Sequence, residues 1–206
     1  MDINEVFSHS QVGLLGEALN IGAGNAVTAL SQLLQRDTDM GLPVLHGFLS
    51  PLSSENIGSF LGNKTRVGMN IVGELQGGLV FVIPEDDENG FANLIRQAKE
   101  EQRCAGVSDI SLVVEIANIM AGVFLTAIHD FCGLNIFHTV PIAGKGVPDS
   151  LHGILQHTTD DPDELMLLIT NEFSIDTSNM KTQLLVLLSV SNASRLIQAI
   201  ENNGMQ

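Results

Sequence analysis

One stretch of the chain occurs twice, and this internal repeat restricts the possible folds more than any other feature. Residues 13–43 align with residues 111–141 without insertion or deletion, at an offset of 98 positions (for example, 115 minus 17). Seven of the fourteen positions from 17 to 30 are identical in the two copies: Glu17, Asn20, Ile21, Ala23, Gly24, Thr28 and Ala29. A solenoid needs about three or more copies, so two copies predict a duplicated unit.

The repeated stretch has the pattern of a helix with one polar edge. In the second copy, polar or small residues recur at spacings of three and four, namely Ser111, Glu115, Asn118, Gly122, Thr126 and His129. Such spacings place residues on one face of an α-helix. Most positions between them are apolar, which predicts burial around most of the circumference. We therefore expect a core helix whose polar stripe reaches the surface, because unpaired buried polar groups are costly.

The stripe has two interpretations, a solvated helix edge or a functional site. Glutamate is an ordinary residue on an exposed helix face. Asparagine is a weak helix former, so its presence at both Asn20 and Asn118 indicates a requirement other than helix stability. A carboxamide can donate a hydrogen bond to a water molecule and accept one from it. The repetition therefore favours the functional interpretation.

Both halves predict the same order of elements. The first half is expected to form a helix from Ser8 or Ser10 to about Gln35, a strand at 42–49, a short helix at 53–61, strands at 65–75 and 78–83, and a helix at 89–99. The second half is expected to form a helix at 109–131, a strand at 134–140, a short helix or loop at 150–156, strands at 165–173 and 182–190, and a helix at 192–202. Hairpin-connected strands with surrounding helices predict an α+β fold with a mostly antiparallel sheet of six strands.

Composition excludes several classes of partner and chemistry. Nine Lys plus Arg against 24 Asp plus Glu give a formal net charge of −15, which disfavours nucleic acid and anionic membranes. The first residues lack the basic region and apolar core of a secretory signal, so we expect a cytoplasmic protein with Cys104 and Cys132 reduced. No metal motif is present, and no role is assigned to the scattered histidines His9, His46, His138, His152 and His157.

Two glycines of the first copy need an explanation that is not ligand binding. Gly22 and Gly24 lie inside a helix that follows no strand, so they are not a dinucleotide fingerprint. We expect them to permit close helix packing. The chain also lacks a Walker-type Gly-x4-Gly-Lys and a Gly-x-Ser-x-Gly elbow, which leaves Glu-x-x-Asn as the one repeated polar constellation.

The repeated residues resemble a known signature. The pattern Asp/Ser-x3-Glu-x2-Asn-x22-Pro is similar to that of the CheC/CheX/FliY family of chemotaxis phosphatases, and the chain has it twice, as CheC does. The second copy matches at every position: Ser111, Glu115, Asn118 and Pro141. The first copy matches at Glu17, Asn20 and Pro43 and departs from the pattern at Gly13.

The resemblance implies a fold and a number of sites. It implies a pseudo-two-fold-symmetric CheC-like fold with both motif helices on one face of the sheet. The chain is then a single CheC-like domain, residues 1–206, made of two pseudo-repeats at about 1–103 and 104–206. Symmetry implies two separate sites, each offering its Glu and Asn to solvent.

A Glu and an Asn alone form neither a nucleophile with its base nor a metal cage, so the substrate must be reactive by itself. An aspartyl phosphate on a receiver domain meets this condition, because the receiver supplies a divalent metal and a lysine and leaves mainly the positioning of water. The resemblance implies that Asn20 and Asn118 orient this water, while Glu17 and Glu115 pair with the receiver's lysine. No cofactor is expected on this chain, and Mg²⁺ would arrive with the CheY-like partner.

The sequence thus leads to the hypothesis of a phosphatase for phosphorylated CheY-like response regulators, with Ser111, Pro43 and Pro141 in the substrate-binding surface. Two alternatives stay open. One is an adaptor that binds a response regulator or a CheD-like deamidase without turnover. The other is a flagellar-switch-associated module, which should carry a fused FliN-like segment. Because Gly13 offers no side chain where Ser111 can support Glu115, we expect the first site to be the weaker one.

Overall fold

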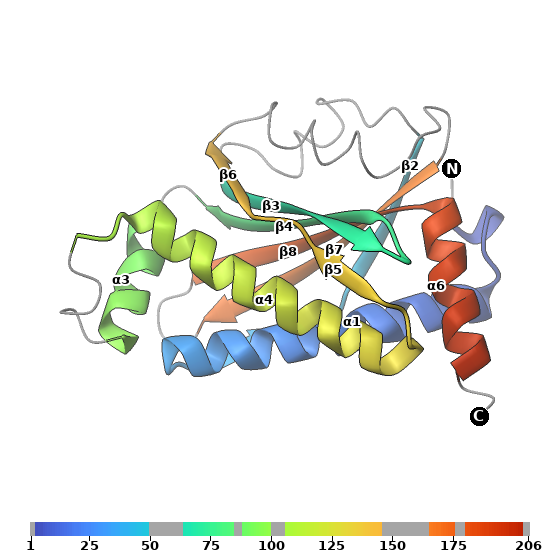
Figure 1. Cartoon of the computed structure of the whole chain (residues 1–206), viewed down its shortest axis with the longest axis horizontal. Helices are drawn as coiled ribbons and strands as arrows, with labels where there is room; N and C mark the ends of the chain where they lie inside the picture. Colours follow the sequence, from blue (N-terminus) through green and yellow to red (C-terminus); the bar gives the residue numbers. More distant parts are fainter. Residues whose placement is uncertain are drawn as a thin grey trace.

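Two long helices lie side by side under one face of a single sheet. The computed structural model describes residues 3–49, 64–84, 88–99, 106–145, 165–175 and 180–203, so the segments expected at 53–61 and 150–156, and Cys104, lie outside them. The long helices are α1 (His9–Leu34) and α4 (Asp109–Cys132), and they pack against each other (Figure 1). The shorter helices α3 (Glu88–Ala98) and α6 (Val190–Asn203) lie at opposite ends of this pair, and a 3-10 turn, η1 (Ile3–Glu5), precedes α1.

The sheet is antiparallel throughout its described pairings. Its strands are β1 (Thr38–Met40), β2 (Val44–Leu49), β3 (Lys64–Gly73), β4 (Gly77–Pro84), β5 (Ile136–His138), β6 (Ile142–Lys145), β7 (Leu165–Ile175) and β8 (Met180–Ser189). Their order is β1-β7-β8-β4-β3-β5, and β2 and β6 add to the outer sides of β7 and β3. The α+β fold with both motif helices on one face is confirmed.

The eight strands occupy the six expected positions, because each outer strand is broken in two. The break between β1 and β2 contains Pro43, and the break between β5 and β6 contains Pro141. Proline has no N–H to donate to a strand ladder. The breaks are equivalent, since β5 begins 98 residues after β1 (136 minus 38) and β6 begins 98 residues after β2 (142 minus 44). The strands expected at 42–49 and 134–140 correspond to β2 and β5, but β1 and β6, on the other side of each proline, were not predicted.

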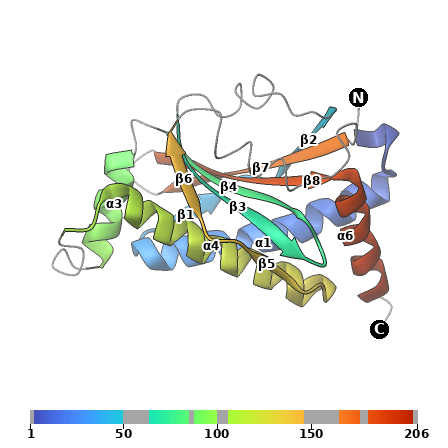
Figure 2. The same cartoon turned by 45° about the horizontal axis from the view of Figure 1, so that its top comes forward.

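Each half of the chain completes the sheet of the other half. The strands β1 and β2 pair with β7, whereas β5 and β6 pair with β3. The two halves join at the centre through β4 and β8. Figure 2 shows β6 and β5 following one another along one edge of the sheet, on the side where α4 lies. The edge strands therefore bring the segment around each motif proline close to a motif helix of the same half.

Serine caps fix where both motif helices begin. The hydroxyl of Ser8 accepts a hydrogen bond from the backbone N–H of Gln11, and the Gln11 side chain accepts one from the Ser8 N–H, which is a complete capping box. The hydroxyl of Ser108 likewise accepts from the Ser111 N–H. At the other end, α4 stops at Gly133, whose φ of 78° suits glycine.

The two glycines of the first copy turn out to differ. A Cβ on Gly22 would lie 2.7 Å from Cε2 of Phe124 on α4, so the helices approach as closely as they do because residue 22 has no side chain. Gly24 has no such neighbour within 4 Å. The prediction of close packing is confirmed for Gly22 and wrong for Gly24, which faces the polar stripe.

Among the described helices, α4 has the length and composition of a membrane-spanning helix. By length and composition alone it could cross a membrane, since its 24 residues include a stretch of mean hydropathy 1.9. Half of that stretch, 50%, is buried inside the fold. A core helix of a globular domain has the same composition, and α4 packs on α1 and on the sheet edge.

We predict opposite effects for two alanine substitutions two residues apart. Both remove a glycine from a helix interior, which stabilises by up to about 1 kcal/mol. Gly24→Ala should show this gain, because the new methyl group meets no atom. Gly22→Ala should destabilise, because overpacking against Phe124 costs about 1–3 kcal/mol. Urea unfolding measures both, and equal stabilisation by the two variants would contradict the close helix contact.

Candidate functional site

The stripe of the second copy reaches the surface as the sequence predicts. Ser111, Glu115, Asn118, Thr126 and His129 are exposed on α4, and Gly122 between them is half-buried. The neighbouring apolar residues of α4 are buried in the core. Glu115 and Asn118 therefore stand on the wet edge of a helix that is otherwise held on most sides.

The first copy presents the same groups on α1. Glu17 and Asn20 are exposed, as is Gly13, while Gly24 is half-buried at the position equivalent to Gly122. Each helix thus offers one carboxylate and one carboxamide to solvent, three residues apart on one face. The structure places all four predicted Glu and Asn residues where a partner protein can reach them.

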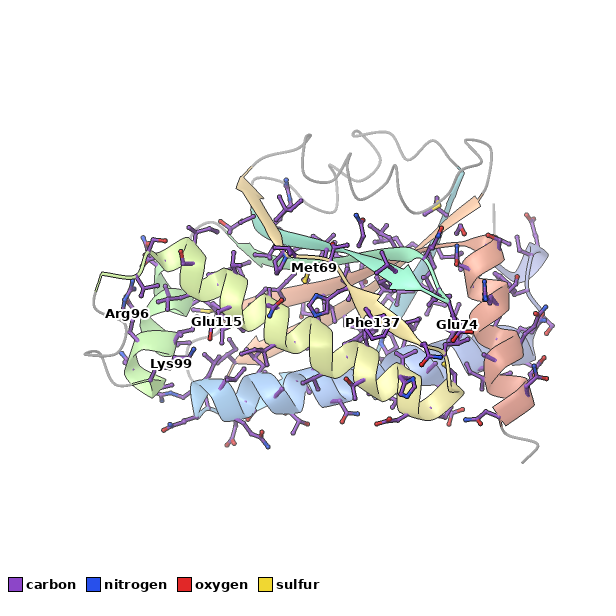
Figure 3. The ribbon with its side chains drawn as sticks, in the orientation of Figure 1. Met69, Glu74, Arg96, Lys99, Glu115 and Phe137 are labelled. Carbon is purple, nitrogen blue, oxygen red and sulfur yellow. The ribbon has the colours of Figure 1, made fainter. Side chains whose placement is uncertain are left out.

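The carboxylate of Glu115 already has a cationic partner within the chain. The Nζ of Lys99, just beyond the end of α3, lies 3.2 Å from Glu115 Oε1, and the Glu115 side chain is 59% exposed (Figure 3). Nearby, Arg96 forms an ion pair with Asp109 at 2.5 Å and donates to the carbonyl of Val107 at 2.9 Å. These contacts attach α3 to the beginning of α4. An ion pair this exposed contributes at most about 1 kcal/mol, so a lysine of another protein can compete for Glu115.

The two copies differ at this point. Glu17 forms no ion pair with any other residue that the structure describes. The expected hydrogen bond from Ser111 to Glu115 is also not formed. The Ser111 hydroxyl lies 2.7 Å from the hydroxyl of Ser108, because residue 111 sits in the first turn of α4 beside the cap. What distinguishes the second carboxylate is therefore Lys99, a residue that the sequence motif does not contain.

A hollow of about 400 Å³ opens beside Asn118. Its polar lining comes from three elements: Asn118, Thr126 and Asp130 from α4, Asn25 from α1 and His138 from β5. A second hollow of about 400 Å³ shares Gly122, Thr126 and His138 with the first and extends to Asn135 and Phe137. The absent side chain of Gly122 leaves the space in which the two hollows meet. Asn25 and His138 were missed in the sequence, because only the fold brings them to the stripe.

The motif prolines lie between exposed apolar side chains. Leu42 and Val44 flank Pro43 and are 83% and 50% exposed. The equivalent residues of the second copy, Val140 and Ile142, are 82% and 56% exposed. Pro43 and Pro141 themselves are half-buried. Their membership in a substrate-binding surface stays a prediction, but the segments around them carry matching apolar groups in both halves.

Metal-ligating groups and the thiol of Cys132 are the remaining candidates for chemistry among the described residues. No group of three or more His, Cys, Asp or Glu residues in the described ranges is arranged to hold a metal ion. Cys132 is a buried free thiol, and its burial raises the pKa of that thiol. A buried thiol with a raised pKa is a poor nucleophile.

A carboxylate anchors the turn that leads from α4 into β5. The backbone N–H and the side-chain amide of Asn135 both donate to Oε2 of Glu74, each at 2.8 Å, and the Glu74 N–H donates to the Asn135 carbonyl at 3.0 Å. The two hydrogen bonds from Asn135 lower the pKa of Glu74. This contact joins the β3–β4 turn to the segment that lines the second hollow (Figure 3).

The Glu74 contact predicts a pH-dependent stability difference. Because the pKa of Glu74 is lower in the folded state than in the unfolded state, its contribution is present at neutral pH and is lost as the pH falls through the folded pKa. Glu74→Gln should therefore be less stable than the natural chain at pH 7, and the two should converge in acid. Urea midpoints at several pH values measure this. In an Asn135→Ala background the difference should shrink, and a difference that grows in acid would contradict the assignment.

Comparison with known sequences returns to the repeated stretch. The sequence profile of the CheC-like family matches residues 14–46 and 110–144, which include both copies of the motif. Over 148 residues, the chain is 30% identical to the CheY-P phosphatase CheC of Bacillus subtilis (strain 168). The aligned region covers 68% of this chain and 69% of the relative.

Comparison with solved structures shows the same fold. FliY of Thermotoga maritima superposes with a TM-score of 0.72 at 21% identity, over 96% of this chain and 98% of that chain. A chain of the CheX-CheY-BeF3-Mg²⁺ complex of Borrelia burgdorferi superposes with a TM-score of 0.51 at 15% identity, over 86% of this chain and 97% of that chain. At these identities the likeness concerns the fold, and the chemistry has to be argued from the site.

Proposed function

Because this chain belongs to the CheC-like family of chemotaxis proteins, we propose that it hydrolyses the aspartyl phosphate of a phosphorylated CheY-like response regulator. The observation that carries the proposal is the paired exposure of Glu and Asn on both core helices. A relative 30% identical to this chain is a CheY-P phosphatase, and a structural neighbour is part of a complex that contains CheY.

In this proposal, the asparagine positions the attacking water. The oxygen of the water attacks phosphorus, the bond from phosphorus to the aspartyl oxygen breaks, and its electron pair stays on the carboxylate of the receiver. Mg²⁺ held by the receiver would balance the charge on the phosphoryl group. Asn118 and Asn20 can each hold a water by donating one hydrogen bond and accepting another. Their fixed place on a packed helix supplies the orientation on which phosphoryl transfer mainly depends.

The glutamate fixes the receiver in place. We assign Glu115 and Glu17 to the lysine of the receiver's phosphorylation site. In the free protein, Lys99 forms an ion pair with Glu115, and we propose that the receiver's lysine forms the same ion pair in the complex. Exchange of one lysine for another leaves the carboxylate paired throughout docking. Ser111 and the segments around Pro43 and Pro141 complete the proposed docking surface, with apolar side chains at Leu42 and Val140.

Two other functions predict different results in the same assay. An adaptor would bind the activated receiver, or a CheD-like protein, without releasing phosphate. A flagellar-switch module would likewise bind without turnover. Release of phosphate by catalytic amounts of this chain separates the phosphatase from both. The proposed activity also places the protein in the cytoplasm, where response regulators are phosphorylated.

The two sites can be compared by removing each in turn. Glu115→Ala with Asn118→Ala should remove most of the phosphate release, because Lys99 orders the carboxylate of the second site in advance. Glu17→Ala with Asn20→Ala should remove much less, because we expect the first site to be about tenfold slower than the second. The free side chain of Glu17 has to be ordered on docking, which costs up to about 2 kcal/mol. Both variants should unfold at the same temperature as the natural chain, because all four side chains are exposed. Loss of stability in either double variant would instead make the stripe structural.

Replacing the carboxamide of Asn118 by a carboxylate tests the positioning of water. In the background without the first site, Asn118→Asp should release phosphate about 100-fold more slowly, because a carboxylate donates no hydrogen bond and repels the phosphoryl group. Asn25→Asp is the matched control, since it adds the same charge to the same hollow from α1. The control should keep most of the activity. Equal losses would show that charge alone, and not the lost donor, explains the effect.

A further inference from the structure

His138 enters the second site from the sheet edge. It lies on β5, and its side chain lines the same hollow as Asn118. Its Nε2 is 3.7 Å from the place where a Cβ on Gly122 would be, and Gly122 follows Asn118 by one helical turn on the same face. Nε2 of His138 thus borders the space that the missing side chain of Gly122 leaves open.

The orientation of this imidazole follows from its other nitrogen. Nδ1 of His138 lies 3.0 Å from the carbonyl oxygen of Thr139. A carbonyl only accepts hydrogen bonds, so we assign the proton of the neutral ring to Nδ1. Nε2 then carries a lone pair, and it points toward the hollow beside Asn118. A backbone carbonyl that holds one nitrogen of a histidine fixes which atom is available at the other.

In the described part of the first half, no imidazole occupies the equivalent place. The residue 98 positions before His138 is Met40, which is packed against the hydrophobic core. The glycine equivalent to Gly122 is Gly24, and no atom beyond its own helix lies within 4 Å of its Cβ position. Among the residues that the structure describes, the imidazole at this position is therefore a feature of the second copy and not of the first.

We propose that His138 is a third catalytic group of the second site, which accepts the proton of the attacking water. This inference rests on the proposed function. As the water oxygen bonds to phosphorus, one of its protons moves to Nε2 and the aspartyl oxygen leaves with the electron pair of the broken bond. The proton then passes to the released phosphate or to solvent. Asn118 orients the water from the helix, while His138 faces it from the strand.

The surroundings of His138 contain few other titratable groups. In the described part of the two hollows these are Asp130 and His129, both on α4. Helix α1 contributes the neutral Asn25, and β5 contributes Phe137. Variation of rate with pH that depends on residue 138 can therefore be separated from other causes by substitution.

The test uses the full chain carrying Glu17→Ala and Asn20→Ala, so that only the second site acts. The substrate is a CheY-like receiver domain of the same organism, phosphorylated with acetyl phosphate, with its spontaneous hydrolysis subtracted at each pH. In this background, His138→Met installs the residue of the first half, and His138→Gln keeps a polar group that cannot take a proton. His129→Met is the control, because its Nδ1 is also held by a backbone carbonyl, that of Leu134 at 2.9 Å.

The expected result is a kcat lower by roughly tenfold or more for both His138 variants, with KM little changed, since general bases contribute on the order of 100-fold or more. The dependence of the parent rate on pH should differ from that of both His138 variants, because only the parent can transfer a proton at residue 138. His129→Met should match the parent. Thermal unfolding of every variant shows whether the fold is kept.

The outcomes separate this inference from the function on which it rests. If the natural chain releases no phosphate from any receiver tested, the proposed phosphatase function fails; if the natural chain is active but the parent without the first site is not, the function stands and the role of His138 fails. If the parent is active and His138→Gln or His138→Met keeps both its kcat and its pH profile, the function stands and His138 is not the proton acceptor. A rise in KM with unchanged kcat would assign His138 to docking and would also overturn the proposal.

Discussion

The close approach of α1 and α4 is the constraint on which the rest of the molecule depends. At Gly22 the ring of Phe124 takes the space of a side chain, and both helices also cover the sheet. Each helix therefore has one face in the core, with eight buried residues in α1 and eleven in α4, and presents its motif stripe at the surface. Polar motif residues are confined to that stripe, because elsewhere they would be buried without partners. The position of the candidate site thus follows from the close packing of the two core helices.

This packing also bears on how so few residues could serve the proposed reaction. Glu115 and Asn118 stand on a helix with eleven residues buried in the core, so their backbone positions are set by that packing. A reactive acyl phosphate needs mainly an oriented water, and orientation is what a rigid helix supplies. The internal ion pair with Lys99 extends the same principle to the carboxylate, which is ordered before any partner arrives.

The parts of this structure that could be predicted from the sequence are those with local signals. The caps at Ser8 and Ser108 and the spacing of three and four residues define both motif helices and the exposure of Asn118. The breaks of the edge strands could not be predicted, because a break becomes visible only when the partner strand is known. Lys99 and His138 were missed for a related reason. Each comes from an element outside the motif, and no spacing in the sequence records the contact.

The exchange of edge strands between the halves has a consequence for the order of events during folding. The partner of Val44 in β2 is Thr170 in β7, which lies 126 positions further along the chain (170 minus 44). Closing so long a connection is slow compared with forming helices and hairpins, and it leaves strand edges unpaired meanwhile. During synthesis, β2 therefore waits for nearly the whole chain to leave the ribosome. Although duplicated in sequence, neither half can finish its own sheet while the other is missing.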